Sequence, residues 1–154
     1  MDDKDFMLSA ISQASLAASE GEVPVGAVIV RNGEIIATGR NRREYGKNAL
    51  YHAEIEAIDN ACKTLGGWRL PGCTLYVTME PCAMCAGAII NSRIKKIYIG
   101  TMDEKTGAVG SVFNLFEDYT FNHKVETETE ILKEECEGIL KRFFKELRKI
   151  KNGG

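Results

Sequence analysis

The middle of the chain alternates between helical and extended patterns, and this alternation restricts the available folds more than any other feature. Two segments carry apolar side chains at helical spacing, and an apolar run of strand length follows each. In order, the segments are a helix at His52 to Leu65, a strand at Thr74 to Met79, a helix at Cys82 to Ile90 and a strand at Ile94 to Ile99. Strands that alternate with helices favour one sheet with helices on both faces.

The N-terminal part adds a helix and a hairpin. Phe6 to Ser19 carries apolar residues at helical spacing, and Gly21 follows as a stop signal. Val23 to Val30 is rich in valine, and a second apolar run, Ile35 to Ala37, resumes after Asn32-Gly33. Asn-Gly between two apolar runs is the strongest short hairpin signal, so we expect two antiparallel strands here.

The remaining segments are assigned by the same patterns. We expect loops at Arg40 to Asn48 and Asp103 to Ser111, a short helix at Val112 to Phe116, a fifth strand at His123 to Thr127 and a final helix at Glu130 to Ile150. The apolar face predicted for that last helix consists of Ile131, Cys136, Ile139, Leu140, Phe143 and Leu147.

The length of 154 residues predicts a single domain at 1–151, with Asn152-Gly153-Gly154 as a loose C-terminal end. Lys and Arg total 20 against 22 Asp and Glu, so a polyanion would have to bind at a local basic patch. No apolar stretch approaches the roughly 20 residues that span a bilayer, and the acidic start lacks a signal-peptide pattern. We therefore expect a cytoplasmic protein that does not enter a membrane.

Two of the predicted helices open with residues that bind metals. His52-Ala53-Glu54 begins one helix and Pro81-Cys82-Ala83-Met84-Cys85 begins the next. Cys82 and Cys85 project from the same helix face, and the positive amino end of a helix favours thiolates. If the two helix starts lie side by side, the imidazole and both thiolates converge. This donor set suits zinc better than calcium or magnesium.

The other cysteines decide whether such a zinc site is closed. Five cysteines, an odd number, with no export signal argue against a disulfide framework. Cys62 lies roughly 15 Å along the helix from His52, and Cys73 lies about 20 Å from Cys82 along the strand, so neither reaches the site. Sequence spacing leaves Cys136 and His123 open as a fourth ligand.

Three protein ligands would leave one zinc position open for water, which is the arrangement of a catalytic site. Zinc-bound hydroxide can attack a ring carbon that carries an amine, and Glu54 is placed to shuttle the protons. H-x-E followed by P-C-x-x-C is the signature of zinc-dependent nucleobase deaminases. A thioredoxin-like redox pair and a purely structural zinc site are the two other interpretations of these residues.

Several longer stretches identify a family. The chain resembles the bacterial tRNA-specific adenosine deaminases of the cytidine deaminase superfamily over nearly its whole length. The matching stretches are Glu22 to Val28, Gly39 with Asn41, His52 to Glu54, Trp68 to Leu70, Thr74 to Cys82, Cys85 to Ala88 and Lys105 to Ser111. The resemblance implies a three-layer α/β/α cytidine-deaminase-like fold around a mixed five-stranded sheet.

The resemblance also implies an activity, in which adenosine becomes inosine at the wobble position of a tRNA anticodon. It assigns one zinc ion per chain to His52, Cys82 and Cys85, with Glu54 as the catalytic proton shuttle. The implied substrate-binding residues are Asn41 and the backbone of Ala53 at the adenine edge, Val23 on the ring, Asp103 and Lys105 at the flanking nucleotides, and Phe144 and Arg148 at the anticodon loop. The implied partners are a tRNA anticodon stem-loop and a second copy of the chain in a homodimer.

Two basic segments bear on an RNA substrate. Lys141 to Lys151 contains six Lys or Arg residues against one Glu, interleaved with Phe143 and Phe144. Such a stretch can contact phosphate and stack an unpaired base. The same residues can equally complement a helix dipole and pack a core. Arg40 to Lys47 forms a second basic loop, in which Glu44 is the acidic residue.

Other functions on the same fold remain open at this point. A small-molecule deaminase of guanine, cytidine or a riboflavin precursor would share the zinc chemistry and ignore an anticodon stem-loop. A noncatalytic zinc module would bind RNA without deaminating it. A redox protein would need no metal and would oxidise Cys82 and Cys85 reversibly.

Overall fold

Five strands in the described part of the chain form one mixed sheet in the order β2-β1-β3-β4-β5. The computed structural model describes residues 1–118 and 120–153. The strands are β1 (Gly26–Arg31), β2 (Glu34–Arg40), β3 (Cys73–Met79), β4 (Lys96–Thr101) and β5 (Glu126–Glu128). β1 pairs antiparallel with β2 and β3, whereas β3 with β4 and β4 with β5 are parallel. The predicted mixed five-stranded sheet is therefore confirmed.

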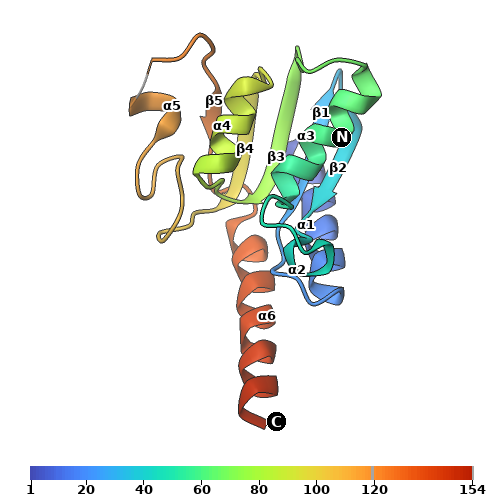
Figure 1. Cartoon of the computed structure of the whole chain (residues 1–154), viewed down its shortest axis with the longest axis vertical. Helices are drawn as coiled ribbons and strands as arrows, with labels where there is room; N and C mark the ends of the chain where they lie inside the picture. Colours follow the sequence, from blue (N-terminus) through green and yellow to red (C-terminus); the bar gives the residue numbers. More distant parts are fainter. Residues whose placement is uncertain (119, 154) are drawn as a thin grey trace.

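Helices cover both faces of this sheet (Figure 1). α3 (Ala53–Leu65) and α4 (Ala83–Asn91) pack on one face. α1 (Asp3–Ser19) and the first turns of α6 (Lys133–Gly153) pack on the other. This is the three-layer α/β/α arrangement that the sequence predicts. Two short helices, α2 (Arg43–Gly46) and α5 (Leu115–Asp118), lie in the connections.

Successive strand residues point into two different hydrophobic clusters. The cluster under α3 and α4 takes Ala27, Ile29, Leu75, Val77, Ile97 and Ile99 from the sheet. The cluster under α1 and α6 takes Val28, Val30, Tyr76 and Tyr98. Because neighbouring residues of a strand face opposite sides, a strand buried on both faces is apolar along its whole length. This explains why β1, β3 and β4 carry consecutive apolar residues instead of an alternating pattern.

The hairpin that the Asn-Gly pair predicts joins β1 and β2. Arg31 pairs with Glu34, which leaves Asn32 and Gly33 as a two-residue loop. The backbone angle φ is 52° at Asn32 and 77° at Gly33. A type I′ turn needs positive φ at both central positions, so these two residues suit this loop.

Two boundaries near the N-terminus differ from those expected. α1 begins at Asp3 instead of Phe6, because Asp2 caps the first turn. The side chain of Asp2 accepts a hydrogen bond from the backbone amide of Asp5, and the side chain of Asp5 accepts one from the backbone amide of Asp2. This reciprocal cap satisfies two free amides of the first turn. β1 begins at Gly26, three residues later than expected.

The connections after β2 and after β4 also differ from the prediction. β2 extends to Arg40, and the predicted loop at Arg40 to Asn48 contains the helix α2. The short helix predicted at Val112 to Phe116 is instead α5 at Leu115–Asp118.

The last helix begins later and ends later than predicted. Glu130 and Leu132 have φ values of 67° and 53°, which a right-handed helix does not permit. α6 therefore starts at Lys133, and the amide of Ile131 donates to the carbonyl of Ile99 instead of joining the helix. Asn152 and Gly153, predicted as part of a loose end, continue α6. Gly154, the third residue of that predicted end, lies outside the described residues. Among the described helices, none is both long enough and apolar enough to cross a bilayer.

One glycine in β2 allows α3 to approach the sheet closely. A Cβ atom at Gly39 would collide with the backbone carbonyl of Ala53 and the backbone amide of Ala57. Backbone atoms of a packed helix cannot move aside without moving the helix. We therefore expect Gly39→Ala to lower the free energy of unfolding by about 1–3 kcal/mol, measured by urea denaturation.

Gly67 provides the control, because no atom lies within 4 Å of a Cβ built there. Gly67→Ala should change the free energy of unfolding by less than about 0.5 kcal/mol. Equal stabilities of the two variants would show that α3 is free to shift away from β2.

Candidate metal centre and active-site pocket

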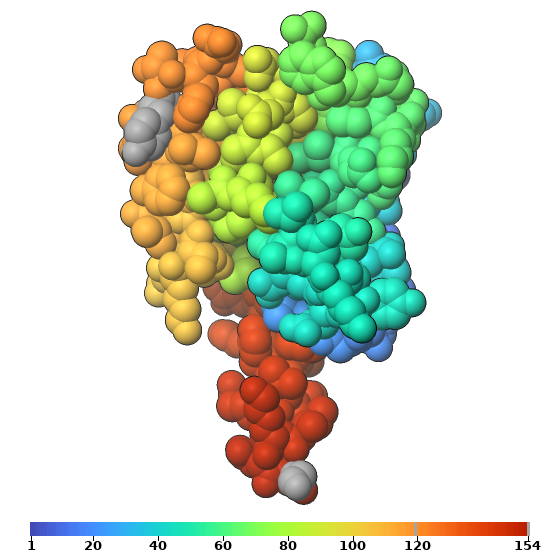
Figure 2. Space-filling view, in the orientation of Figure 1, coloured from blue at the N-terminus to red at the C-terminus, as the bar shows by residue number. Residues whose placement is uncertain are grey.

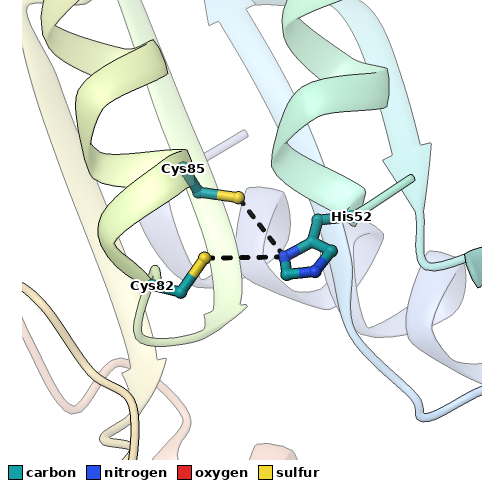
Figure 3. Close-up of side chains that lie close together, drawn as sticks. All are labelled: His52, Cys82 and Cys85. Atoms are coloured by element: carbon teal, nitrogen blue, oxygen red, sulfur yellow. Dashed lines mark hydrogen bonds between the residues drawn. The ribbon is translucent and has the colours of Figure 1, made fainter. Parts of the chain in front are cut away.

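His52, Cys82 and Cys85 lie together at the starts of two neighbouring helices (Figure 3). Their ligand atoms are all within 4.8 Å of one another. His52 immediately precedes α3, while Cys82 immediately precedes α4 and Cys85 lies in its first turn. The convergence predicted from two distant sequence segments is therefore confirmed.

The local backbone leaves these side chains free for a ligand. His52 and Cys82 both occupy N-cap positions, where a side chain commonly accepts a hydrogen bond from the helix. Neither side chain makes such a bond. Instead, Nδ1 of His52 lies 3.7 Å from Sγ of Cys82 and 3.5 Å from Sγ of Cys85.

The electrostatics of the group favour a bound cation. A hydrogen bond from the Cys85 thiol lowers the pKa of Cys82 to about 4. The same contact with Cys82 raises the pKa of Cys85, and hydrogen bonding to Cys82 raises the pKa of His52. The lowered pKa of Cys82 favours a thiolate there, and a bound cation in place of the Cys85 proton would favour a second one. Two sulfurs and one imidazole nitrogen fit zinc.

The residues that the sequence left open as a fourth ligand lie elsewhere. Nε2 of His123 is 2.6 Å from the carbonyl oxygen of Ile94. Cys136 is buried on the other face of the sheet, in the cluster under α1 and α6. Across residues 1–118 and 120–153, the group around His52 has no fourth His, Cys, Asp or Glu ligand.

Glu54 is a buried carboxylate at the start of α3, 4% exposed. Burial raises its pKa to about 7. A carboxyl group with a pKa near neutrality can both accept and release a proton under physiological conditions. It also lines the same cavity as His52 and Cys82.

That cavity has a volume of about 360 Å³ and contains most of the substrate-binding residues predicted from the sequence. Its lining residues are Val23, Val25, Asn41, Arg43, His52, Ala53, Glu54, Met79, Glu80, Cys82, Asp103, Lys105, Thr106 and Phe144. Six of the seven predicted substrate-binding residues are thus brought together. Arg148 is exposed on α6 and does not line the cavity.

Asn41 is nearly buried at the cavity wall, 5% exposed. Its Nδ2 donates to the carbonyl of Val23 at 3.1 Å, and its Oδ1 accepts from the amide of Arg43 at 3.3 Å. These bonds fix the orientation of the side chain. An orientation fixed in advance costs less entropy when a ligand binds.

Two buried glutamates hold segments next to the cavity, and no sequence motif marks them as functional. Glu22, 1% exposed, accepts hydrogen bonds from the amides of Glu44 and Tyr45 at 3.0 and 2.7 Å. Glu80, 4% exposed, accepts bonds from the loop that follows β4. In the sequence, each of these glutamates lies directly next to an apolar run predicted as a strand. This position is the signal that could have indicated that they are buried.

Both basic segments contain residues that are paired with acidic side chains, and in the segment on α6 these are Lys141 with Glu137 and Lys149 with Glu146. Arg40 pairs with Glu20 at 2.7 Å and Arg42 with Glu56 at 2.8 Å, so half of the basic residues in the predicted loop are neutralised. Arg43, by contrast, lines the cavity.

The basic segment on α6 extends away from the domain (Figure 2). Cys136, Ile139 and Leu140 are buried as predicted, whereas Phe143 and Leu147 are only partly buried. Phe144 is 40% exposed and reaches the cavity. The interpretation of this segment as core packing is therefore wrong for Phe144.

Comparison with known proteins assigns the family. Residues 1–148 match the model of the MafB19-like deaminases. The fold, the His-Cys-Cys group and this match place the chain in that deaminase family, and the protein is an enzyme of this class.

More specific relatives lie within this class. The chain is 52% identical over 149 residues to the tRNA-specific adenosine deaminase of Bacillus subtilis, covering 97% of this chain and 92% of the relative. It is 47% identical over 143 residues to the tRNA-specific adenosine deaminase of Aquifex aeolicus, covering 93% and 94%. The resemblance noted in the sequence is confirmed.

A solved structure agrees with this assignment. It comes from work on A-to-I editing by tRNA:A34 deaminases at the wobble position of transfer RNA. The two folds superpose with a TM-score of 0.85 at 43% identity, covering 88% of this chain and 99% of that chain. The predicted cytidine-deaminase-like fold is thereby confirmed.

Proposed function

We propose that the protein deaminates adenosine to inosine at the wobble position of a tRNA anticodon. The observation that carries the proposal is a match over 97% of the chain to a tRNA-specific adenosine deaminase, in a molecule whose cavity combines a His-Cys-Cys group with a buried glutamate. A redox function finds no comparable support, because the relatives are deaminases.

The proposed cofactor is one zinc ion per chain, held by His52, Cys82 and Cys85. Zinc, when bound, lowers the pKa of a water molecule to around 7 and so supplies the nucleophile of a hydrolytic deamination. The three side chains would contribute two thiolate sulfurs and the Nδ1 atom of an imidazole, which lie close together. The absence of a fourth ligand among the described residues supports a catalytic centre rather than a structural one.

Glu54 moves the protons in the proposed mechanism. Its carboxylate takes one proton from the attacking water and delivers it to N1 of the adenine ring. It then takes the second proton from the new C6–OH group and delivers it to the departing amine. The C6–N bond breaks after the C6–O bond has formed, so water and adenosine give inosine and ammonia. The burial of Glu54 and its pKa of about 7 support this role.

The cavity walls would hold the base. We assign Asn41 and the backbone of Ala53 to the edge of the adenine and Val23 to its ring face, since all three line the cavity. An adenosine in an anticodon loop is unpaired, so moving it into the cavity costs less than extruding a base from a duplex.

The cavity rim would hold the neighbouring nucleotides. Asp103 and Lys105 lie on the loop after β4, and Phe144 lies on α6, where it can stack on an unpaired base. Arg148, one turn further along α6, would contact phosphate. Because the net charge of the chain is −2, the attraction for RNA would have to come from local basic segments such as this one.

Two further parts of the proposal concern assembly and location. The resemblance to bacterial tRNA deaminases implies a homodimer. Leu50 and Tyr51, which precede α3 and are 56% and 45% exposed, support a partner surface there. A tRNA substrate also implies a cytoplasmic enzyme.

Incubation with a synthetic anticodon stem-loop tests the function directly. With adenosine at the wobble position, the zinc-loaded protein should convert that nucleotide to inosine, detected by nuclease digestion and mass spectrometry. Other adenosines in the same RNA serve as internal controls and should stay unchanged.

Free guanine and cytidine test the alternative substrate class in the same experiment. We expect no turnover of either compound. Rapid deamination of guanine or cytidine, with an unchanged stem-loop, would assign the protein to the small-molecule deaminases instead.

A further inference from the structure

The loop after β4 is wrapped around one buried side chain, the carboxylate of Glu80. Oε1 accepts a hydrogen bond from the amide of Asp103 at 2.9 Å and another from the hydroxyl of Ser111. Oε2 accepts from the amides of Val109 and Ser111 at 2.9 and 3.0 Å. Both ends of the loop are thus bonded to the same carboxylate.

The carboxylate is satisfied by neutral donors alone. Glu80 is 4% exposed. Within the described residues, its hydrogen-bond donors are backbone amides and one hydroxyl, and no cationic side chain forms an ion pair with it. A buried charge without a counterion is stable only when it is fully hydrogen-bonded. The four donors come from residues 23–31 positions away in the sequence, so the loop conformation and the burial of the charge depend on each other.

Gly107 shows how closely the loop encloses the carboxylate. A Cβ atom at this position would collide with the carboxyl carbon and both oxygens of Glu80. The amide of Gly107 in turn donates to the carbonyl of Asp103 at 2.9 Å. The backbone therefore passes directly over the buried group, with no room for a side chain.

The residues held in this way form one wall of the cavity. Asp103, Lys105 and Thr106 all line it. The Asp103 carboxylate accepts bonds from the amides of Lys105 and Thr106 at 3.1 and 3.2 Å, so these three residues form one turn. Because Glu80 bonds the amide of Asp103, it fixes the position of that turn relative to β3.

We propose that Glu80 is a positioning residue that sets the cavity wall and thereby selects the nucleotides flanking the target adenosine. The inference rests on the proposed function. Glu80 also lines the cavity, but both of its oxygens are occupied by the loop, so its effect on the substrate is exerted through Asp103 and Lys105.

Glu80→Gln is the most direct test, because it keeps the shape of the side chain and replaces one acceptor oxygen with a donor. An NH₂ group would then face the donors of the loop, and at least one bond is lost. We expect KM for the stem-loop to rise about 10-fold, with kcat within about 2-fold and zinc content unchanged. The preference among stem-loops that differ at the flanking nucleotides should also shrink.

Glu104→Gln is the matched control. Glu104 is exposed on the same loop, so this variant removes one negative charge near the RNA without breaking the bonds to Glu80. We expect KM no higher than that of the unchanged protein, because RNA is a polyanion. A drop in kcat of Glu80→Gln at unchanged KM, or no kinetic change at all, would overturn the proposal.

Gly107→Ala and Ser111→Ala disturb the same contact without altering Glu80. Both substitutions should raise KM for the stem-loop, as Glu80→Gln does. If Glu80→Gln does not fold, these two variants test the positioning role of Glu80 in its place. Unchanged KM in both would also overturn the proposal.

Hydrogen exchange separates this inference from the proposed function. The amides of Val109 and Ser111 should be protected in the unchanged protein and exchange faster in Glu80→Gln, whatever the substrate is. If the unchanged protein leaves the stem-loop intact, the proposed function fails and the selection of flanking nucleotides fails with it. Equal exchange in both proteins would refute the positioning role itself.

Discussion

Replacing Glu54 with alanine should lower deamination of the stem-loop by about 10²- to 10⁴-fold, while the protein still binds one zinc ion per chain. The carboxylate is buried and lines the cavity beside His52 and Cys82, and in the proposed function it accepts the proton of the attacking water. Alanine removes the proton route and leaves all three proposed zinc ligands in place. The measurement is single-turnover formation of inosine, together with metal analysis of the same sample.

Glu54→Gln is the stricter version of this experiment. It keeps the size of the side chain and the packing of α3 but cannot accept a proton, so its rate should be as low as that of the alanine variant. RNA binding, measured by fluorescence anisotropy, should be nearly unchanged in both. Activity within about 3-fold of the unchanged protein would exclude Glu54 as the proton shuttle.

Loss of one proposed zinc ligand should lower deamination as strongly as loss of Glu54, because the protein then no longer binds the metal. Cys85→Ala leaves two protein ligands, so we expect less than about 0.1 zinc per chain and no detectable inosine. Cys85 is fully buried at the start of α4, and alanine is both smaller and favourable in a helix. The fold should therefore persist, which circular dichroism can check.

Cys62 supplies the matched control for this substitution. It is a partly exposed cysteine on α3 whose Sγ lies 3.7 Å from the carbonyl oxygen of Trp68, away from the metal centre. Cys62→Ala should retain zinc and activity. If Cys85→Ala kept a full equivalent of zinc and deaminated the stem-loop, the proposed ligand set would be wrong.

The central fold and the candidate metal group were predictable because their signals are local. The Asn-Gly pair determines the turn between β1 and β2, and apolar spacing marks α3 and α4. The candidate ligands His52, Cys82 and Cys85 precede or open helices whose starts are evident in the sequence. Once both helices pack on the same face of the sheet, the three side chains can meet.

The features that were missed depend on contacts between distant residues. Nothing near Glu80 in the sequence shows that its hydrogen-bond donors lie at positions 103, 109 and 111. Similarly, Glu22 receives its hydrogen bonds from α2, a helix too short to produce a periodic pattern. The start of α6 was misplaced because the positive φ angles of Glu130 and Leu132 interrupt a sequence that otherwise suits a helix.

The second half of α6 extends away from the sheet (Figure 1), and beyond Leu140 its side chains are mostly exposed. Substitutions at such positions disturb little packing, so they carry a small stability penalty. In the proposed function, two of these residues, Phe144 and Arg148, contact the RNA. The affinity of the enzyme for its substrate can therefore change through mutation in this helix without endangering the folded domain, and selection can adjust recognition and stability separately.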